Sequence, residues 1–298
     1  MPPLADPAVF RIGYVEMATA ALPDALAYYT DIIGAKLTAR GDGGAAYLSL
    51  GLHHHDIALT AAGDGAAHIV GYQLRPDLAL ADLARRLGEI GIATQRRRDA
   101  RPGVAELLEI AVAGHTLQFF QDMAMPAPGF SSVGIAPNRI GHVALLSPEA
   151  HRLVTLFTAG LGFTETDWFE DVVTFLTCNR DHHVMNVIAA PVAKLHHVAF
   201  ELRGQPQQFE AADLLARAAR PVVWGPSRHT AGHNLASYHY GPDRTLIELY
   251  TDMDIYLRGL GYFEPRPWHD VLPQRPRRWA LADLTTWRTP FDFDFSRA

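Results

Sequence analysis

The sequence has little of what several protein classes require. A single cysteine, Cys178, excludes an internal disulfide and is typical of a reducing compartment. No uninterrupted apolar run approaches the ~18 residues of a transmembrane helix. The first ten residues, MPPLADPAVF, lack the basic segment and long apolar stretch of a secretory signal. We therefore expect a cytoplasmic protein that does not associate with a membrane.

Positive charge is in the minority, with 26 Lys and Arg against 32 Asp and Glu. The net charge is -6 and the isoelectric point is near 6.2, which argues against nucleic acid or an anionic membrane as a partner. The 298 residues are 48% hydrophobic and 19% charged, as in ordinary globular proteins, and suffice for about two domains. Histidine, by contrast, is abundant: there are 15, and many lie between residues 142 and 239.

The chain repeats itself at an offset of 128 residues, since Arg11–Val15 matches Arg139–Val143 and 139 − 11 = 128. The same offset matches His68–Tyr72 with His196–Phe200. The two copies cover about 9–125 and 136–253 and are joined by a Pro/Gly-rich linker at 123–130. We therefore expect two domains, residues 1–130 and 131–298.

Each copy again divides into two similar parts. In the second copy, a strand at about 139–145 precedes a helix that Ser147-Pro148 starts and glycines near 160–162 end. Three strand-like runs follow, and the pattern restarts with the strand at 194–202. This order predicts an α+β fold of four βαβββ modules. Residues 254–298 fall outside the repeat and form either a packed tail or a lid over a pocket.

Three chemically important residues break the repeat. The second copy carries His142, His197 and Glu248 where the first carries Tyr14, Ile69 and Phe119, or Gln118 if the later Asp-Met match sets the register. The first copy builds the same scaffold without them, so we expect a metal in the second copy only. Two imidazoles and a carboxylate on strands favour an octahedral divalent cation with open positions. The helical His-Glu-x-x-His pattern of zinc hydrolases is absent.

Around these residues the chain resembles the type I extradiol ring-cleavage dioxygenases, the catechol 2,3-dioxygenase group of the vicinal oxygen chelate superfamily. The resemblance spans about 9–253. It is carried by three segments: Ile140-Gly-His142-Val-Ala, Leu195-His-His197-Val-Ala-Phe, and Gly225-Pro-Ser-Arg-His229 through Tyr238 to Thr245-Leu-Ile-Glu248-Leu-Tyr250. It implies modules paired into two glyoxalase/bleomycin-resistance-like domains with mixed curved sheets.

The same resemblance implies a site. It assigns the metal to His142, His197 and Glu248, with Fe(II), or else Mn(II), as the cofactor and O2 as the co-substrate. Family spacings assign catalytic roles to His182, His229 and Tyr238, which lie 15 residues before His197 and 19 and 10 residues before Glu248. His182 also matches His54 of the first copy, so it can equally be inherited scaffold.

The substrate implied by the resemblance is a small aromatic diol of the catechol type, and the protein is expected to be a homo-oligomer. Ring cleavage of an aminophenol or hydroquinone is the alternative, followed by a glyoxalase-like isomerase and a metal-free binding protein. Arg228 and His233 are weaker candidates for contacts with substrate or oligomer. Expected lining residues of the ring pocket point to an apolar substrate: Ala144, Trp168, Phe175, Val184, Asn186 and Trp224. Arg275, Arg277 or Arg278 could instead bind a carboxylate of the substrate if their segment is a lid.

Overall fold

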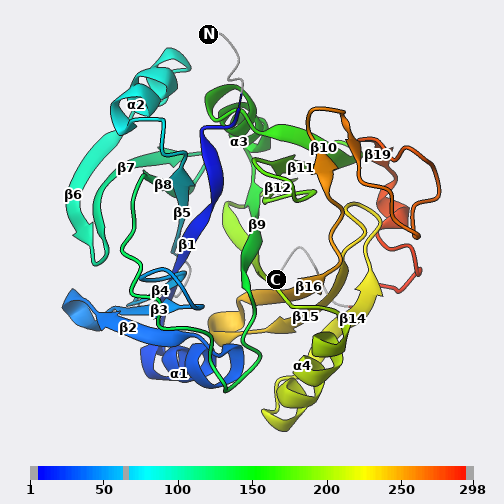
Figure 1. Cartoon of the computed structure of the whole chain (residues 1–298), viewed down its shortest axis with the longest axis horizontal. Coiled ribbons are helices and arrows are strands. Elements are labelled where there is room, and N and C mark those ends of the chain that lie inside the picture. The colour runs from blue at the N-terminus through cyan, green and yellow to red at the C-terminus, as the bar shows by residue number, and fades with distance from the viewer. Residues whose placement is uncertain (1–5, 63–66, 293–298) are drawn as a thin grey trace.

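Two curved sheets lie side by side in the computed structural model, which describes residues 6–62 and 67–292 (Figure 1). The first half forms two βαβββ modules. Their elements are β1 (Val9–Thr19), α1 (Leu22–Ala27) with η1 (Tyr28–Ile33), β2 (Lys36–Arg40), β3 (Ala46–Ser49), β4 (Ile57–Ala61), then β5 (His68–Leu74), α2 (Leu80–Glu89), β6 (Gln95–Arg101), β7 (Val104–Val112) and β8 (His115–Phe120).

The second half repeats this order. Its elements are β9 (Arg139–Ser147), α3 (Ala150–Thr155) with η3 (Leu156–Gly160), β10 (Thr164–Phe169), β11 (Val173–Thr177), β12 (Met185–Ala189), then β13 (Lys194–Glu201), α4 (Gln205–Arg217), β14 (Val222–Arg228), β15 (Leu235–Tyr240) and β16 (Leu246–Thr251). The expected α+β fold of four modules is therefore confirmed. The division into domains at residue 130 stays a prediction.

Strand pairing shows how equivalent the two sheets are. The first has the order β2-β3-β4-β1-β5-β8-β7-β6, and the second has β14-β15-β16-β13-β9-β12-β11-β10 with β19 (Arg278–Trp279) added at its edge. In each sheet the first strands of the two modules run antiparallel at the centre, β1 beside β5 and β9 beside β13. The outer strands of each module flank this central pair, so residues on the central strands lie deep in the sheet.

Apolar packing and polar contacts join the halves. One core cluster includes Val15 and Val70 of the first sheet and Val143 and Val198 of the second, all fully buried. Such β-branched residues suit the interior of a sheet. The Tyr28 hydroxyl lies 2.6 Å from Nε2 of His239, which links η1 to β15.

The C-terminal segment joins the second sheet. It contributes β17 (Tyr256–Leu257), β18 (Tyr262–Phe263), β19 and the short turn η5 (Leu281–Asp283), and β19 pairs in parallel with β10. This places the residues outside the repeat over the end of the sheet that carries β10 and β11 (Figure 1). Among the described residues, no helix has the length and apolar character needed to cross a membrane.

Candidate metal centre

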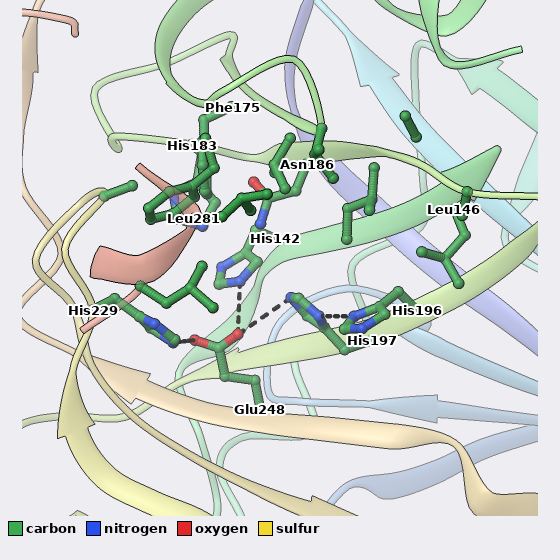
Figure 2. Close-up of a pocket in the computed structure, with 18 of the residues that line it drawn as sticks. His142, Leu146, Phe175, His183, Asn186, His196, His197, His229, Glu248 and Leu281 are labelled. Atoms are coloured by element: carbon green, nitrogen blue, oxygen red, sulfur yellow. Dashed lines mark hydrogen bonds and ion pairs between the residues drawn. The ribbon is translucent and has the colours of Figure 1, made fainter. Parts of the chain in front are cut away.

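His142, His197 and Glu248 converge from three neighbouring strands (Figure 2). Ala199 of β13 lies opposite His142 of β9 on one side and opposite Glu248 of β16 on the other. Its methyl group leaves the space between the two side chains open, and His197 reaches the same space from two residues earlier. The Nε2 atoms of His142 and His197 lie 3.1 and 3.2 Å from the same Glu248 oxygen, Oε2.

The electrostatics of this cluster favour a neutral His197 beside an ionised Glu248 carboxylate. Burial lowers the pKa of His197 well below its usual value, although Glu248 opposes this. Burial raises the pKa of Glu248, but His142 and His197 outweigh burial and hold that pKa below its usual range. All three side chains are almost completely inaccessible to solvent. Neutral imidazoles and a carboxylate are the protonation states that bind metal.

The donor set fits a divalent cation. Nε2 of His197 is buried and has no hydrogen-bond partner within the described part of the chain, an arrangement that is costly unless a ligand uses the lone pair. The atoms of the three residues that could bind a metal lie within 4.8 Å of one another. Two imidazoles and one carboxylate bind one face of an octahedral ion and leave positions open.

Polar side chains surround the Glu248 carboxylate. Tyr238, directly opposite Glu248 on β15, donates a 2.9 Å hydrogen bond to Oε2, and Asn234 donates a 2.9 Å bond to Oε1. Nε2 of His229 lies 3.1 Å from the Tyr238 hydroxyl. The structure therefore brings the sequence-predicted Tyr238 and His229 next to His142, His197 and Glu248, which we call the triad. Asn234 was not predicted, because it lies in a loop where no strand periodicity marks its direction.

The triad closes the buried end of a cavity of about 320 Å³. Beyond the polar group, the wall is apolar and comes from β9 to β12, the loop before β15 and the C-terminal segment. Its apolar residues are Leu146, Phe169, Val172, Val173, Phe175, Ile188, Ala189, Ala190, Pro191, Ala231, Leu281, Leu284 and Phe291. Leu281, Ala189 and Pro191 are exposed, so the cavity opens to solvent at the end of β12.

The third predicted catalytic residue, His182, is fully buried and is not part of the cavity wall. His183, not His182, lies on the cavity wall, with its ring centroid 4.3 Å from that of His142. Both nitrogens of His182 face other residues: Nδ1 lies 2.9 Å from Nδ1 of His183, and Nε2 lies 3.1 Å from the Asp167 carboxylate. Strand alternation could not distinguish the two histidines, because they precede β12 in an irregular loop.

The predicted lining is correct for Phe175 and Asn186 only. Ala144, Trp168, Val184 and Trp224 are not among the residues that form the wall, although Trp224 stacks on His229 with a centroid distance of 5.1 Å. The three candidate arginines also lie elsewhere. Arg275 donates to the Gly261 carbonyl, Arg277 pairs with Asp270, and Arg278 pairs with Asp171.

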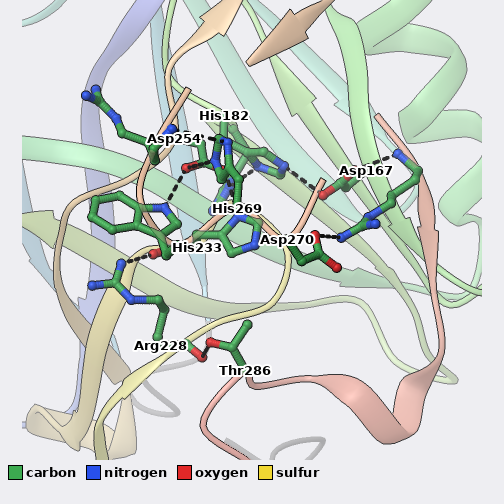
Figure 3. Close-up of polar contacts among 12 residues, drawn as sticks. Asp167, His182, Arg228, His233, Asp254, His269, Asp270 and Thr286 are labelled. Carbon is green, nitrogen blue, oxygen red and sulfur yellow. Dashed lines mark hydrogen bonds and ion pairs between the residues drawn. The ribbon is translucent and has the colours of Figure 1, made fainter. Parts of the chain in front are cut away.

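Arg228 and His233 belong to a polar cluster beside the cavity (Figure 3). Asp254 accepts bonds from His233 Nδ1 at 2.7 Å, His269 Nε2 at 2.9 Å and Trp268 Nε1 at 3.1 Å, and Arg228 donates to the His233 carbonyl. His269 Nδ1 accepts from a backbone N–H, so its Nε2 carries the proton and donates. This arrangement is a hydrogen-bonded clamp on the C-terminal segment.

The first sheet shows what replaces the triad. Gln118 lies opposite Gly71 as Glu248 lies opposite Ala199, so Gln118 and not Phe119 is the counterpart of Glu248. The Tyr14 hydroxyl donates to Gln118 Oε1 at 2.5 Å, and Arg101 Nη2 donates to the same oxygen at 2.7 Å. A cationic side chain of the protein therefore lies at this position of the first half.

The fold and the triad together define a class: chains of the vicinal oxygen chelate fold with a 2-His-1-carboxylate group in one half. The solved structure of the 2,3-dioxygenase LapB from Pseudomonas sp. KL28 matches with a TM-score of 0.80 and 21% identity over 92% of this chain and 99% of that one. The Mn(II)-bound glyoxalase from Novosphingobium aromaticivorans matches with a TM-score of 0.79 and 24% identity, over 94% and 91%.

Two proteins with established names are similar to this chain in sequence. Metapyrocatechase 2 of Cupriavidus necator is 27% identical over 122 residues, which are 40% of this chain and 38% of that protein. Biphenyl-2,3-diol 1,2-dioxygenase of Metapseudomonas furukawaii is 25% identical over 198 residues, 60% and 65% respectively. Each match spans less than two thirds of the relative. No protein-family profile matches the chain. The resemblance to extradiol dioxygenases is confirmed by these relatives.

Proposed function

We propose that this protein is an extradiol dioxygenase that uses Fe(II) and O2 to open the ring of a catechol-type diol in aromatic catabolism. The observation that carries the proposal is the convergence of His142, His197 and Glu248 at the buried end of an apolar cavity. When bound there, the metal would hold both diol oxygens, lower their pKa values and carry electrons from the ring to O2. Mn(II) suits the same donors.

Tyr238 and His229 would orient the substrate. Burial and the neighbouring Glu248 raise the pKa of Tyr238 well above its usual value, so the phenol keeps its proton and can donate a hydrogen bond. Burial lowers the pKa of His229, which favours the neutral imidazole beside that phenol. Two fixed polar groups next to the metal position hold a diol in one orientation. His183, on the opposite wall, takes the acid–base role in place of His182.

The cavity supports a catechol with an apolar substituent. Its wall contains no Lys or Arg, and Glu248 is its only carboxylate among the described residues. A carboxylate on the substrate would therefore be buried without a cationic partner, which is costly. Lining residues run from Asn186 on β12 to Ala190 just past its end, about 13 Å at the rise of a strand, so the cavity extends beyond one ring.

The proposal also assigns the two halves different tasks. Residues 1–130 form a domain without metal, in which Tyr14, Ile69 and Gln118 replace the ligands. Residues 131–298 form the catalytic domain. Its C-terminal extension, 254–298, belongs to this domain because Leu281, Leu284 and Phe291 contribute to the cavity wall. A homo-oligomer in the cytoplasm is the expected state of the protein.

The experiment is anaerobic purification, loading with Fe(II), and measurement of O2 uptake with catechol, 3- and 4-alkylcatechols and 2,3-dihydroxybiphenyl. The proposal predicts one metal per chain, one O2 per diol and a yellow ring-opened product. The matched control is His197→Ala, which should take up neither metal nor O2.

Two other results would overturn parts of the proposal. A metal-loaded protein that oxidises no diol but consumes O2 with an aminophenol or a hydroquinone would move the activity to that ring. A wild-type protein that binds neither Fe(II) nor Mn(II) would remove the metal centre and favour a binding protein.

A further inference from the structure

A line of three buried polar side chains leads away from the cavity wall. His183 lies on the wall, and its Nδ1 is 2.9 Å from Nδ1 of His182. Nε2 of His182 is 3.1 Å from Oδ2 of Asp167 on β10 (Figure 3). Each of the three side chains is at most 3% exposed, so the hydrogen bonds between them do not compete with bulk water.

The chemistry of the groups decides where the protons lie. An ionised carboxylate only accepts, and Asp167 already accepts from the Arg277 N–H at Oδ1 and the Trp279 indole at Oδ2. His182 must therefore donate to it from Nε2. A neutral His182 then accepts at Nδ1, and His183 donates from its own Nδ1. This leaves the lone pair of His183 on Nε2.

We propose that Asp167 and His182 are positioning residues that fix the ring and the proton of His183, so that its Nε2 can accept a proton from a bound diol. The inference rests on the proposed function for the identity of the proton donor. A carboxylate that is hydrogen-bonded to one nitrogen of a catalytic imidazole fixes which of the two nitrogens carries the proton. Here a second imidazole relays the effect of the carboxylate.

The duplication provides an internal comparison. His54 and His55 of the first half show the same contact as His182 and His183: Nδ1 atoms 2.9 Å apart and ring centroids 5.2 Å apart at 90°. The strand registers match Ala39 with Asp167, because Ala39 lies opposite Tyr47 and Asp167 opposite Phe175. The imidazole pair is thus common scaffold, whereas the carboxylate occurs only in the half with the triad.

The same carboxylate also holds the C-terminal segment. Arg277 and Trp279 lie outside the repeat, and both bond to Asp167. Leu281, two residues further on, lines the cavity mouth. Correct placement of the wall and correct orientation of His183 therefore depend on one side chain.

The test replaces the Asp167 carboxylate, which accepts from His182, and also removes the Trp279 indole, which donates to the same oxygen. In the double variant Asp167→Asn/Trp279→Phe, the amide oxygen faces the Arg277 N–H and the NH2 group faces His182. His182 then accepts at Nε2, and the proton of His183 moves to Nε2. Trp279→Phe alone is the matched control, because it keeps the carboxylate. Histidine-selective ¹⁵N NMR of the metal-free full chain reports which nitrogen is protonated, and His183→Gln assigns the signal.

Kinetics on the Fe(II)-loaded protein give the second readout. General-base catalysis is worth about 10²–10⁴-fold, so kcat/KM for an alkylcatechol should fall by ~100-fold or more in the double variant and little in the control. 4-Nitrocatechol ionises far more readily, needs no base, and should lose only a few-fold.

The proposal is overturned if the NMR spectrum shows the same His183 tautomer in the double variant and the control. It is also overturned if both substrates lose activity equally, since that is the result of a merely structural role. Failure of the wild type to oxidise any diol would instead contradict the proposed function. The NMR result would stand in that case, because it requires neither metal nor turnover.

Discussion

Gln118 and Glu248 occupy the same position in the two sheets, each opposite a small residue of the neighbouring parallel strand. Gln118 contacts Tyr14 and Arg101, whereas Glu248 faces two histidines. The same backbone therefore supports an amide paired with a tyrosine and an arginine in one half, and a carboxylate between two imidazoles in the other.

Replacement of Glu248 by Gln should abolish tight metal binding, because the amide is neutral and a poorer ligand. We expect at least about 100-fold weaker Fe(II) affinity, judged from the smaller effects of residues that only support ligands. Metal content after dialysis measures this. Tyr14→Phe, which removes a hydrogen bond to Gln118, the counterpart of Glu248 in the first half, should retain one metal per chain. Equal loss in both variants would contradict the assignment.

Asn234→Ala should weaken metal binding without removing a ligand. The amide donates to Glu248 Oε1 and fixes the carboxylate, and loss of such support typically costs 10–100-fold in affinity. A competition titration with a chelator gives the value. An unchanged affinity would show that the hydrogen bond does not orient Glu248.

Tyr238→Phe, assayed at saturating Fe(II), should reduce kcat by ~100-fold, in the range expected when one positioned donor is lost. Tyr240→Phe is the control, since Tyr240 lies two residues further along β15 and stacks under Arg244, away from the triad. Anaerobic substrate titration separates weaker binding from slower turnover. Equal kcat in the two variants would exclude Tyr238 from the reaction.

A cation at the cavity mouth should change substrate preference. Leu281 is 36% exposed and lines the cavity, so Leu281→Arg places a guanidinium within reach of a substituent. At such an exposed site, pairing contributes up to about 1 kcal/mol, roughly a 5-fold gain in kcat/KM for 3,4-dihydroxyphenylacetate relative to 4-ethylcatechol. Leu281→Gln should show no such gain. A wild type that already prefers the acid would contradict the apolar-substituent proposal.

His239 should make the stability of the protein sensitive to acid. Burial, assisted by Arg220, lowers its pKa in the folded state to about 3, whereas the unfolded value is about 6.5. Below pH 6.5 the unfolded chain therefore binds a proton that the folded chain does not, and the free energy of unfolding decreases as the pH falls toward 3. Above pH 6.5 this contribution is constant.

Urea unfolding at pH 7 and pH 5 tests this expectation. His239→Gln should lose about 2 kcal/mol less than wild type between the two pH values, because one proton-linked equilibrium is removed. The Gln amide can still reach the Tyr28 hydroxyl, which keeps the contact between the halves. Identical losses would show that the pKa of His239 does not differ between the folded and unfolded states.

The modules and the triad could be predicted because the alternation of the strands and the duplication of the chain are both visible in the sequence. Glu248 was matched to Phe119 or Gln118 because the extra residue lies between strands, and only strand pairing decides the register. His183, Asn234 and Leu281 could not be placed: they lie in loops or outside the repeat, where direction depends on contacts distant in sequence. Asp167 could have been singled out from the sequence, because the repeat places Ala39 at the equivalent position of the first half.

The most direct test of the central claim is ring cleavage of 4-ethylcatechol by the Fe(II)-loaded protein under ¹⁸O2, with mass spectrometry and NMR of the product. The account predicts two labelled oxygen atoms in the product, apart from exchange of the aldehyde oxygen with water, and cleavage of a bond beside the diol. An unlabelled product, or cleavage between the two hydroxyl-bearing carbons, would contradict it.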